Sequence, residues 1–246
     1  MTKGRRSAAV STALAAVGGA VAAATTWMAH LGRIPPVEGL TMSTAALILG
    51  GFPAILAGFL ALFRGATGEA RRNAIVGALL GTVLVLIPAT LGARASRMPP
   101  IHDLTTNLDD PPTFFHAGTL AANRDRNLSY PSGLEDTPER QAKDYSDLAP
   151  IVLSLPADRA FDAALETAEH QGWDLTWADP GTGRFEATAT SSVYRLVDDI
   201  AVRVRATDQA SVVDVRSVSR HGVSDFGRNA RRIRAFSKQL AAQNPL

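Results

Sequence analysis

Three apolar runs in the first half of the chain limit its possible folds more than any other feature of the sequence. They cover Ser7–Leu31, Met42–Phe63 and Asn73–Ala93, and none of them contains Asp, Glu, Lys or Arg. A helix crosses a hydrocarbon core of about 30 Å with roughly 20 residues, so each run is long enough. The first run is the least hydrophobic because it is rich in Ala, Gly and Thr. We predict three transmembrane helices within residues 1–97.

Prolines and glycines inside these runs fit packed membrane helices. Pro53 and Pro88 would end a helix in a soluble protein but are tolerated in a membrane bundle. Gly77 and Gly81 form a GxxxG pair, which lets two helices approach closely. Alternatively, these glycines reflect only the small-residue content of the runs, and the sequence leaves both interpretations open.

Charge divides unequally between the two halves of the chain. Residues 1–97 hold nine Lys/Arg and two Glu, whereas residues 98–246 hold sixteen Lys/Arg and twenty-one Asp/Glu. The pI of about 9.3 therefore comes from positive charges beside the apolar runs and does not indicate nucleic-acid binding. Positive charges precede the first run and separate the second from the third. We expect a multi-pass inner (plasma) membrane protein with a cytoplasmic N-terminus and an extracytoplasmic C-terminal half.

The first apolar run has a second interpretation as a signal peptide. Residues 1–24 combine early Lys/Arg, an apolar stretch and small residues at Ala22–Ala24, which suit a cleavage site. The run is long for a signal peptide, which favours a retained helix. Both interpretations place the C-terminal half outside the cytoplasm.

Residues 98–149 are polar and punctuated by prolines. Pro99-Pro100 and Pro111-Pro112 exclude a helix at those points and favour extended or turn conformations. Such a long segment without periodicity is unusual inside a compact domain. We interpret it as a Pro-rich linker, either a mobile tether or an extended arm packed on the following domain; Phe114 and Phe115 favour packing.

Residues 150–246 show the periodic patterns of strands and amphipathic helices. The predicted order is a strand at Pro150–Leu155, a helix at Asp158–Gln171, four antiparallel strands beginning at Trp173, and a helix at about Asp225–Ala242. The fold class is therefore α+β. We expect N-terminal transmembrane helices followed by a two-layer domain, an antiparallel sheet with two helices on one face and a polar, solvated opposite face.

Alternation within the strands predicts which side chains share a face. Trp173, Leu175 and Trp177 alternate with polar residues, so we expect all three on the buried side of the first of these four strands. For the last two strands, a turn at Thr207–Ala210 would place Arg203 directly opposite Asp214. The same register places Val202 opposite Val215, which keeps the apolar residues together on one face.

Several segments together resemble the domain of unknown function 1499 family. They are PPIHDLTTNLDDPP at residues 99–112, Tyr145–Leu148, Gly172-Trp173, DDIAVRVR at 198–205 and DVRSVSRHGVSDFGRNARRIR at 214–234. The likeness covers about residues 98–242. The resemblance implies a bacterial or plastid protein with an extracytoplasmic or lumenal domain behind membrane helices, and it implies no catalytic residues.

The densest group of Asp, Arg and Ser lies at the end of the sheet and the start of the last helix. Ser224 stands where a helix N-cap is expected, with Asp225 in the first turn. Arg216 and Arg220 would either bind an anion together with the helix N–H groups or form a structural ion-pair network. The candidate ligand- or partner-binding residues are Arg216, Arg220, Ser224, Asp225, Arg228 and Asn229, and the candidate ion-pair partners are Asp198, Asp199 and Asp225.

The Asp198-Asp199 pair does not suit acid–base chemistry. Adjacent residues of a strand point to opposite faces of the sheet, so the two carboxylates cannot converge on one substrate without a bulge. The chain contains no Cys, its five histidines lack metal-ligand spacing, and no hydrolase, P-loop or dinucleotide motif is present. We therefore expect no cofactor and no metal site.

These observations favour a membrane-anchored, extracytoplasmic, non-catalytic module. We expect it to contact the lipid bilayer and to bind a membrane or periplasmic protein, or an anionic ligand, in envelope or membrane-complex assembly. The alternative is an enzyme that acts on an anionic envelope or lipid substrate, with Arg216 and Arg220 holding the anion.

Overall fold

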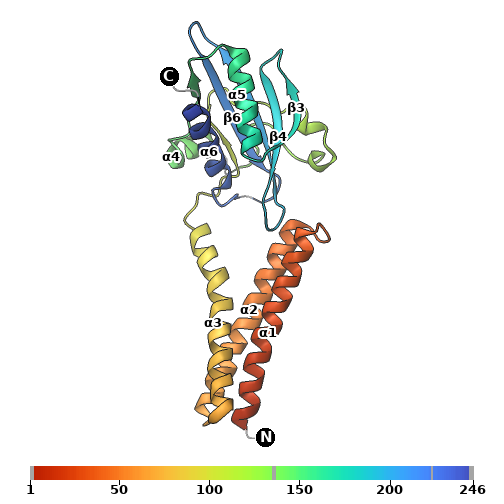
Figure 1. Ribbon diagram of the computed structural model, residues 1–246, viewed down its shortest axis with the longest axis vertical. Coiled ribbons are helices and arrows are strands. Elements are labelled where there is room, and N and C mark those ends of the chain that lie inside the picture. Colours follow the sequence, from red (N-terminus) through yellow and green to blue (C-terminus); the bar gives the residue numbers. More distant parts are fainter. Residues whose placement is uncertain (1–2, 135–136, 223, 244–246) are drawn as a thin grey trace. The chain divides into compact units, whose positions relative to one another are not determined.

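The protein is represented by a computed structural model in which residues 3–134, 137–222 and 224–243 are described (Figure 1). The chain forms two compact units. The helical unit comprises Met1–Arg97 and Ser192–Arg195, and the sheet unit comprises Met98–Ser191 and Leu196–Leu246.

Three long helices build the helical unit: α1 (Lys3–His30), α2 (Pro36–Phe63) and α3 (Gly68–Ala95). All three are long and apolar enough to cross a membrane. Each has 28 residues, which at 1.5 Å per residue gives about 42 Å, more than the hydrocarbon core of about 30 Å. Each therefore extends beyond its predicted apolar run, and Pro53 and Pro88 lie inside helices as expected.

Small residues form the contacts between these helices. A Cβ atom added to Gly18 would lie 2.7 Å from Cα of Gly50, and one added to Gly51 would lie 2.7 Å from the carbonyl oxygen of Gly81. The hydroxyl of Ser11 donates a hydrogen bond across the helices to the Ala54 carbonyl at 2.7 Å. A Cβ atom added to Gly77 would lie 2.7 Å from the Thr12 amide nitrogen, so both members of the GxxxG pair pack closely and the packing interpretation is confirmed.

A sheet whose strands pair antiparallel forms the centre of the second unit. Its order is β1-β6-β5-β4-β3, and β2 also pairs with β6. The strands are β1 (Asp103–Thr105), β2 (Ile151–Leu153), β3 (Asp174–Asp179), β4 (Arg184–Thr190), β5 (Val197–Ala206) and β6 (Ser211–Ser219).

The β5–β6 hairpin has the register predicted from its side chains. Arg203 pairs with Asp214 and Val202 with Val215. At the turn, the Thr207 amide donates to the Ala210 carbonyl at 2.8 Å. The register keeps Val202 and Val215 on one face of the sheet, which we name the apolar face.

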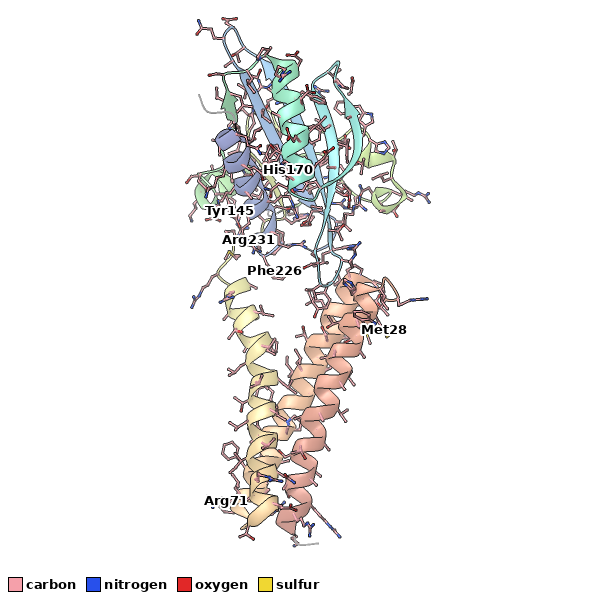
Figure 2. All side chains as sticks on the ribbon, viewed as in Figure 1. Met28, Arg71, Tyr145, His170, Phe226 and Arg231 are labelled. Carbon is pink, nitrogen blue, oxygen red and sulfur yellow. The ribbon has the colours of Figure 1, made fainter. Side chains whose placement is uncertain are left out.

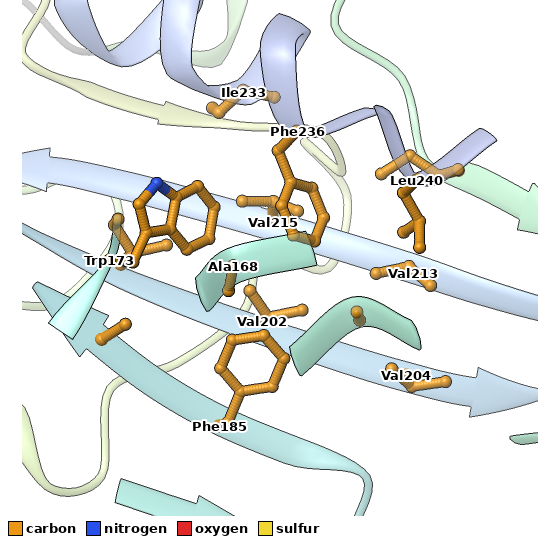
Figure 3. Packing of buried hydrophobic residues seen from close by; sticks show 14 of the residues in the cluster. Ala168, Trp173, Phe185, Val202, Val204, Val213, Val215, Ile233, Phe236 and Leu240 are labelled. Carbon is orange, nitrogen blue, oxygen red and sulfur yellow. The ribbon is translucent and has the colours of Figure 1, made fainter. Parts of the chain in front are cut away.

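Helices α5 (Ala157–His170) and α6 (Arg228–Gln243) cover the apolar face (Figure 1). The Trp173 and Phe236 rings stack at 4.9 Å between centroids, and Phe161 meets Phe185 edge-to-face at 5.9 Å. Figure 3 shows the rings of Trp173, Phe185 and Phe236 among the valines of β5 and β6. Each large apolar side chain buried here contributes about 1.5–3 kcal/mol. The predicted α+β arrangement, with two helices on one face of an antiparallel sheet, is confirmed.

The opposite, polar face of the sheet is not solvated, and that prediction is wrong. Most of its central charged side chains are almost fully buried, with exposed fractions of 0% for Asp214, 1% for Arg216 and 2% for Glu186. Residues 98–149, which we name the arm, supply the cover. The arm contains β1, the 3-10 turns η1 (Ala117–Thr119) and η2 (Ala121–Asn123), and the helix α4 (Pro138–Asp144).

The prediction that Trp173, Leu175 and Trp177 share a buried face is also wrong. Trp173 lies in the apolar core, but Leu175 is 47% exposed. The register of β3 against β4 shifts between Leu175 and Trp177. Trp177 instead stacks on Phe115 of the arm at 6.0 Å between ring centroids. A bulge reverses the facing of later residues, and alternation alone cannot reveal it.

Candidate functional site

Two adjacent aspartates at the start of β5 organise the charged residues around them. Asp198 and Asp199 are buried, with exposed fractions of 0% and 1%. Asp198 bonds to residues of α6, whereas Asp199 bonds to residues of the arm. The two carboxylates therefore point to opposite faces, as the sequence predicts for neighbours on a strand.

Asp198 forms the ion-pair centre on the side of α6. It accepts hydrogen bonds from the Ser219 hydroxyl at 2.6 Å, Arg228 Nη2 at 2.9 Å and Arg232 Nη2 at 2.6 Å. A carboxylate buried without partners would be strongly destabilising, so these three donors make its burial tolerable. The interactions hold the first turn of α6 against β5 and β6.

Asn229 connects α6 to two further backbone segments. Its Nδ2 donates to the His102 carbonyl at 2.8 Å and to the Ser219 hydroxyl at 3.1 Å. Its Oδ1 accepts from the Ser217 hydroxyl at 2.8 Å and from Arg232. Asn229 is 0% exposed, so it fixes the position of α6 and is not accessible to a ligand.

Asp225, and not Ser224, caps α6. The helix begins at Arg228, three residues later than predicted. Asp225 Oδ1 accepts from the Gly227 amide at 2.8 Å, and its Oδ2 accepts from the Asn229 amide at 2.5 Å. Ser224 accepts a hydrogen bond from the Phe226 amide at 3.3 Å, and among the described residues it accepts none from the amides of α6. The Asp225 carboxylate thus occupies N–H groups that an anion bound at the helix start would need.

Burial governs the charge state of Asp225. Desolvation raises the pKa of this carboxyl above its usual value of 3.8, and the nearby charge of Asp198 adds to the increase. The hydrogen bonds from Asn229 and Gly227, and the charge of Arg228, act in the opposite direction. The Asp225 carboxylate therefore acts as a structural helix cap whose burial is only partly offset by its hydrogen bonds.

Asp199 forms the second ion-pair centre, on the side of the arm. Arg220 donates to both of its oxygens, with Nη2 at 2.7 Å from Oδ1 and Nε at 3.1 Å from each oxygen. Arg126 Nη1 lies 2.7 Å from Oδ2, and its Nη2 donates to the Ser219 carbonyl at 2.8 Å. Asn123 Nδ2 adds a bond of 3.2 Å. The arm is therefore fastened to β5 and β6.

Arg216 lies apart from the helix start, on the polar face beneath the arm. Its Nε and Nη2 donate to the two oxygens of Asp103 at 2.9 and 2.7 Å. Its guanidinium carbon lies 5.0 Å from the Phe114 ring centroid and 5.3 Å from that of Tyr130. We expected a partner among Asp198, Asp199 and Asp225; the partner is Asp103, because Arg216 faces away from α6.

Two further buried groups, Glu186 and Asp214, hold the arm, and no sequence pattern assigns them this role. Glu186 accepts hydrogen bonds from the backbone amides of Phe115, His116 and Ala117. Asp214 binds Arg203, as the hairpin register predicted, and it also accepts a hydrogen bond of 3.3 Å from Nδ2 of Asn107 in the arm. Alternation places Glu186 on the polar face, and Phe114 and Phe115 favour an arm packed on the domain, but the sequence does not indicate which face the arm covers.

The space left beneath the arm is small. A pocket of about 10 Å³, enough for about one water molecule, lies on the polar face beside Phe115, Trp177 and Arg203. Across residues 3–134, 137–222 and 224–243, no group of three or more His, Cys, Asp or Glu side chains is placed to hold a metal ion. This arrangement can bind the arm tightly, and it offers little volume for a substrate.

The accessible residues of the region lie in the β6–α6 loop, which joins Ser219 to Arg228. Phe226 lies in this loop, 47% exposed, with a left-handed backbone at φ 55° (Figure 2). His221 is also exposed. Partial desolvation and then the positive charges of Arg126 and Arg220 lower the pKa of His221 below its usual 6.5. At neutral pH the loop therefore presents an uncharged imidazole and an aromatic ring.

Comparison with known families identifies the sheet unit. The family model "Protein of unknown function (DUF1499)" matches residues 103–240, more than half of the chain. The match includes β1 and the remaining arm as well as the sheet and most of α6. A search of curated proteins gave no match. Together these findings show that the chain belongs to the DUF1499 family, whose function is unknown.

Proposed function

We propose that this protein is a membrane-anchored, non-catalytic binding module. In this proposal α1, α2 and α3 span the plasma (inner) membrane, and the sheet unit lies on the extracytoplasmic side. The β6–α6 loop binds a protein partner of a membrane or envelope complex. The apolar length of the three helices and the positive charges of the N-terminus and the α2–α3 loop support this orientation.

The observation that carries the proposal is the conformation of Phe226. A bulky residue with positive φ is unusual, because its Cβ atom crowds the backbone in the left-handed region. Such strain persists only where surrounding structure imposes it, and it concentrates at functional positions. Here the Asp225 side chain accepts a hydrogen bond from the Gly227 amide and so closes a turn around Phe226, whose ring is half-exposed.

The six candidate residues divide into two groups around that ring. Asp225 and Asn229 are buried and support the loop from beneath, whereas Arg216 is buried under the arm, apart from the loop. Arg220, Ser224 and Arg228 are partly exposed beside it. Aromatic and Arg side chains are the residue types that dominate binding energy at protein interfaces. The partner should therefore present an apolar pocket for Phe226 with acidic groups at its edge.

Ion pairing supports a binding module over an enzyme. The carboxylates of Asp103, Asp198, Asp199 and Asp214 each accept hydrogen bonds from Arg side chains. A general acid or base must be free to exchange a proton with a substrate. The alternative, an enzyme acting on an anionic envelope or lipid substrate, would require one of these centres to open.

Gentle detergent purification of the full chain from its native membrane tests the proposal. We expect a co-purifying protein near equal stoichiometry that is lost from Phe226→Ala. Leu175→Ala is the matched control, because Leu175 has the same exposed fraction of 47% and lies on β3, outside the loop. Loss of the partner from both variants, or from neither, contradicts the proposed surface. A bound small anion in place of a protein would favour the enzyme alternative.

A labelling experiment tests on which side of the membrane the sheet unit lies. The natural chain has no Cys, so a single Asp208→Cys substitution in the β5–β6 turn gives one labelling site. A maleimide that cannot cross membranes should label it in intact cells or, in a diderm bacterium, after the outer membrane is opened. Labelling only after the inner membrane is lysed would contradict the orientation.

A further inference from the structure

An open pocket of about 620 Å³ lies within the helical unit, between the start of α1 and the α2–α3 loop. Its volume is within the range of about 300–1,000 Å³ found for small-molecule sites. The lining residues are Arg5, Arg64, Gly65, Ala66, Thr67, Glu69 and Ala70.

Positive charge dominates the pocket and its surroundings. Two arginines and one glutamate line it, and Lys3, Arg6, Arg71 and Arg72 lie nearby in the sequence. Arg64 donates a hydrogen bond of 2.9 Å to the neutral hydroxyl of Ser7. In the described parts of the chain, neither Arg5 nor Arg64 forms an ion pair with a carboxylate. Their charges are available to an anion.

The backbone adds to this preference. Thr67, the N-cap of α3, makes no side-chain hydrogen bond to the helix. The N–H groups of the first turn of α3 therefore lack a capping side chain at the wall of the pocket. Free N–H groups at a helix start favour negative charge and supplement the two guanidinium groups.

The lengths of the helices indicate where such a pocket would lie relative to lipid. Helices of about 42 Å exceed a hydrocarbon core of about 30 Å by roughly 12 Å, so their ends reach the headgroup region. Arg5 is in the first turn of α1 and Arg64 directly follows α2. Phosphate groups are the abundant anions at that depth, and basic pockets between membrane helices bind such headgroups.

We propose that this pocket binds a phosphate-bearing anion, held by the guanidinium groups of Arg5 and Arg64. The planar donor fork of arginine matches phosphate oxygens. The ligand is either the headgroup of an anionic phospholipid or a free phosphate compound. Its binding is independent of the β6–α6 loop and its partner.

Native mass spectrometry of the full chain in detergent, with added phosphatidylglycerol, tests this inference. Arg64→Gln should weaken binding of the first lipid about tenfold, because a charge-assisted hydrogen bond is lost. The matched control, Arg72→Gln, removes the same charge from a residue outside the pocket lining and should change binding less than about twofold. Equal effects of the two substitutions would show general attraction to positive charge and would overturn the proposal.

A gain-of-binding variant covers the case in which Arg64→Gln fails to fold. Glu69→Gln removes the one carboxylate of the pocket lining and should tighten binding about fivefold, because like charge no longer opposes the anion. Unchanged or weaker binding would contradict the proposal.

Two additional ligands distinguish the sources of phosphate. Phosphatidylcholine, which has no net charge, should bind at least about fivefold more weakly than phosphatidylglycerol if the ligand is an anionic headgroup. Inorganic phosphate at millimolar concentration should displace phosphatidylglycerol if the site serves a free anion. Absence of binding by both phosphatidylglycerol and inorganic phosphate would overturn the proposal.

Discussion

The two faces of the same sheet are covered by different means. On the apolar face, α5 and α6 pack against the strands through Phe161 and Phe236, and Trp173 stacks on Phe236. On the polar face, buried charged residues hold an arm with little regular structure. They are the Arg216–Asp103 ion pair, Asp199 with its partners Arg126 and Arg220, and Glu186, which accepts hydrogen bonds from backbone amides of the arm. The comparison teaches that a polar face need not be a solvated face. Hydrophobic burial tolerates many side-chain exchanges, whereas removing one partner of a buried ion pair leaves an uncompensated buried charge.

The largest effect should come from breaking a single ion pair on the polar face. Arg216→Ala leaves the Asp103 carboxylate buried without its main cation, so we expect a loss of about 3–5 kcal/mol in the free energy of unfolding. Ile200→Val, a change at a fully buried position on the apolar face, should cost only about 0.5–1.5 kcal/mol. Denaturant unfolding of the full chain in detergent can measure both changes.

Tryptophan fluorescence can report on the sheet unit alone. The chain has three Trp residues, and only Trp27 lies in the helical unit, so a Trp27→Phe background isolates the signal. If Arg216→Ala costs no more than Ile200→Val, the Arg216–Asp103 pair does not hold the arm as described.

The neighbouring aspartates allow a matched comparison of the two faces. Asp199→Asn should release the arm, with faster amide hydrogen exchange at residues 121–126 and a cost of about 2–4 kcal/mol. Asp198→Asn should instead increase exchange in the first turn of α6 at a similar cost. Faster exchange in the same segment of both variants would contradict the separate roles of Asp199 in holding the arm and Asp198 in holding α6.

A smaller effect of about 1 kcal/mol should appear at Phe226. Phe226→Gly and Phe226→Ala both remove the ring, but only Gly relieves the left-handed backbone strain. We expect the Gly variant to be more stable by about 1 kcal/mol, which thermal unfolding would detect. Equal stability, or a more stable Ala variant, would mean that the loop is not strained.

The smallest effect should be the pH dependence contributed by His221. Its pKa in the folded state is below 6.5, so the unfolded state binds more protons as pH falls through 6.5. Burial and the charges of Arg126, Arg220 and Arg228 oppose its protonation, while Asp198 favours it. Stability should therefore decrease as pH falls below 6.5, and His221→Gln should reduce that slope. An unchanged slope in unfolding measurements from pH 7 to pH 5 would contradict the assignment.

Local patterning predicted those parts of the fold that depend on neighbouring residues. The apolar runs indicated three long helices, and alternation with opposite charges gave the Arg203–Asp214 register. The opposite facing of Asp198 and Asp199 also follows from strand geometry. In each case a period or a pairing rule links residues close in sequence or on adjacent strands.

Such patterns could not predict contacts between residues that lie far apart in the sequence. Arg216 pairs with Asp103 across 113 positions, and nothing in either segment specifies the other. The bulge at Leu175–Trp177 and the start of α6 at Arg228 depend on packing and on the Asp225 cap. The prolines of the arm exclude a long helix, but they do not predict which surface the arm covers.

Crosslinking from the β6–α6 loop tests the central claim most directly. A photoreactive amino acid placed at position 226 of the full chain in native membranes should capture one protein on irradiation. The same amino acid at position 175, equally exposed in the natural protein, should not capture it. A single adduct specific to position 226 is the predicted result. Identical adducts from both positions, or none from position 226, would contradict the claim that this loop is the binding surface.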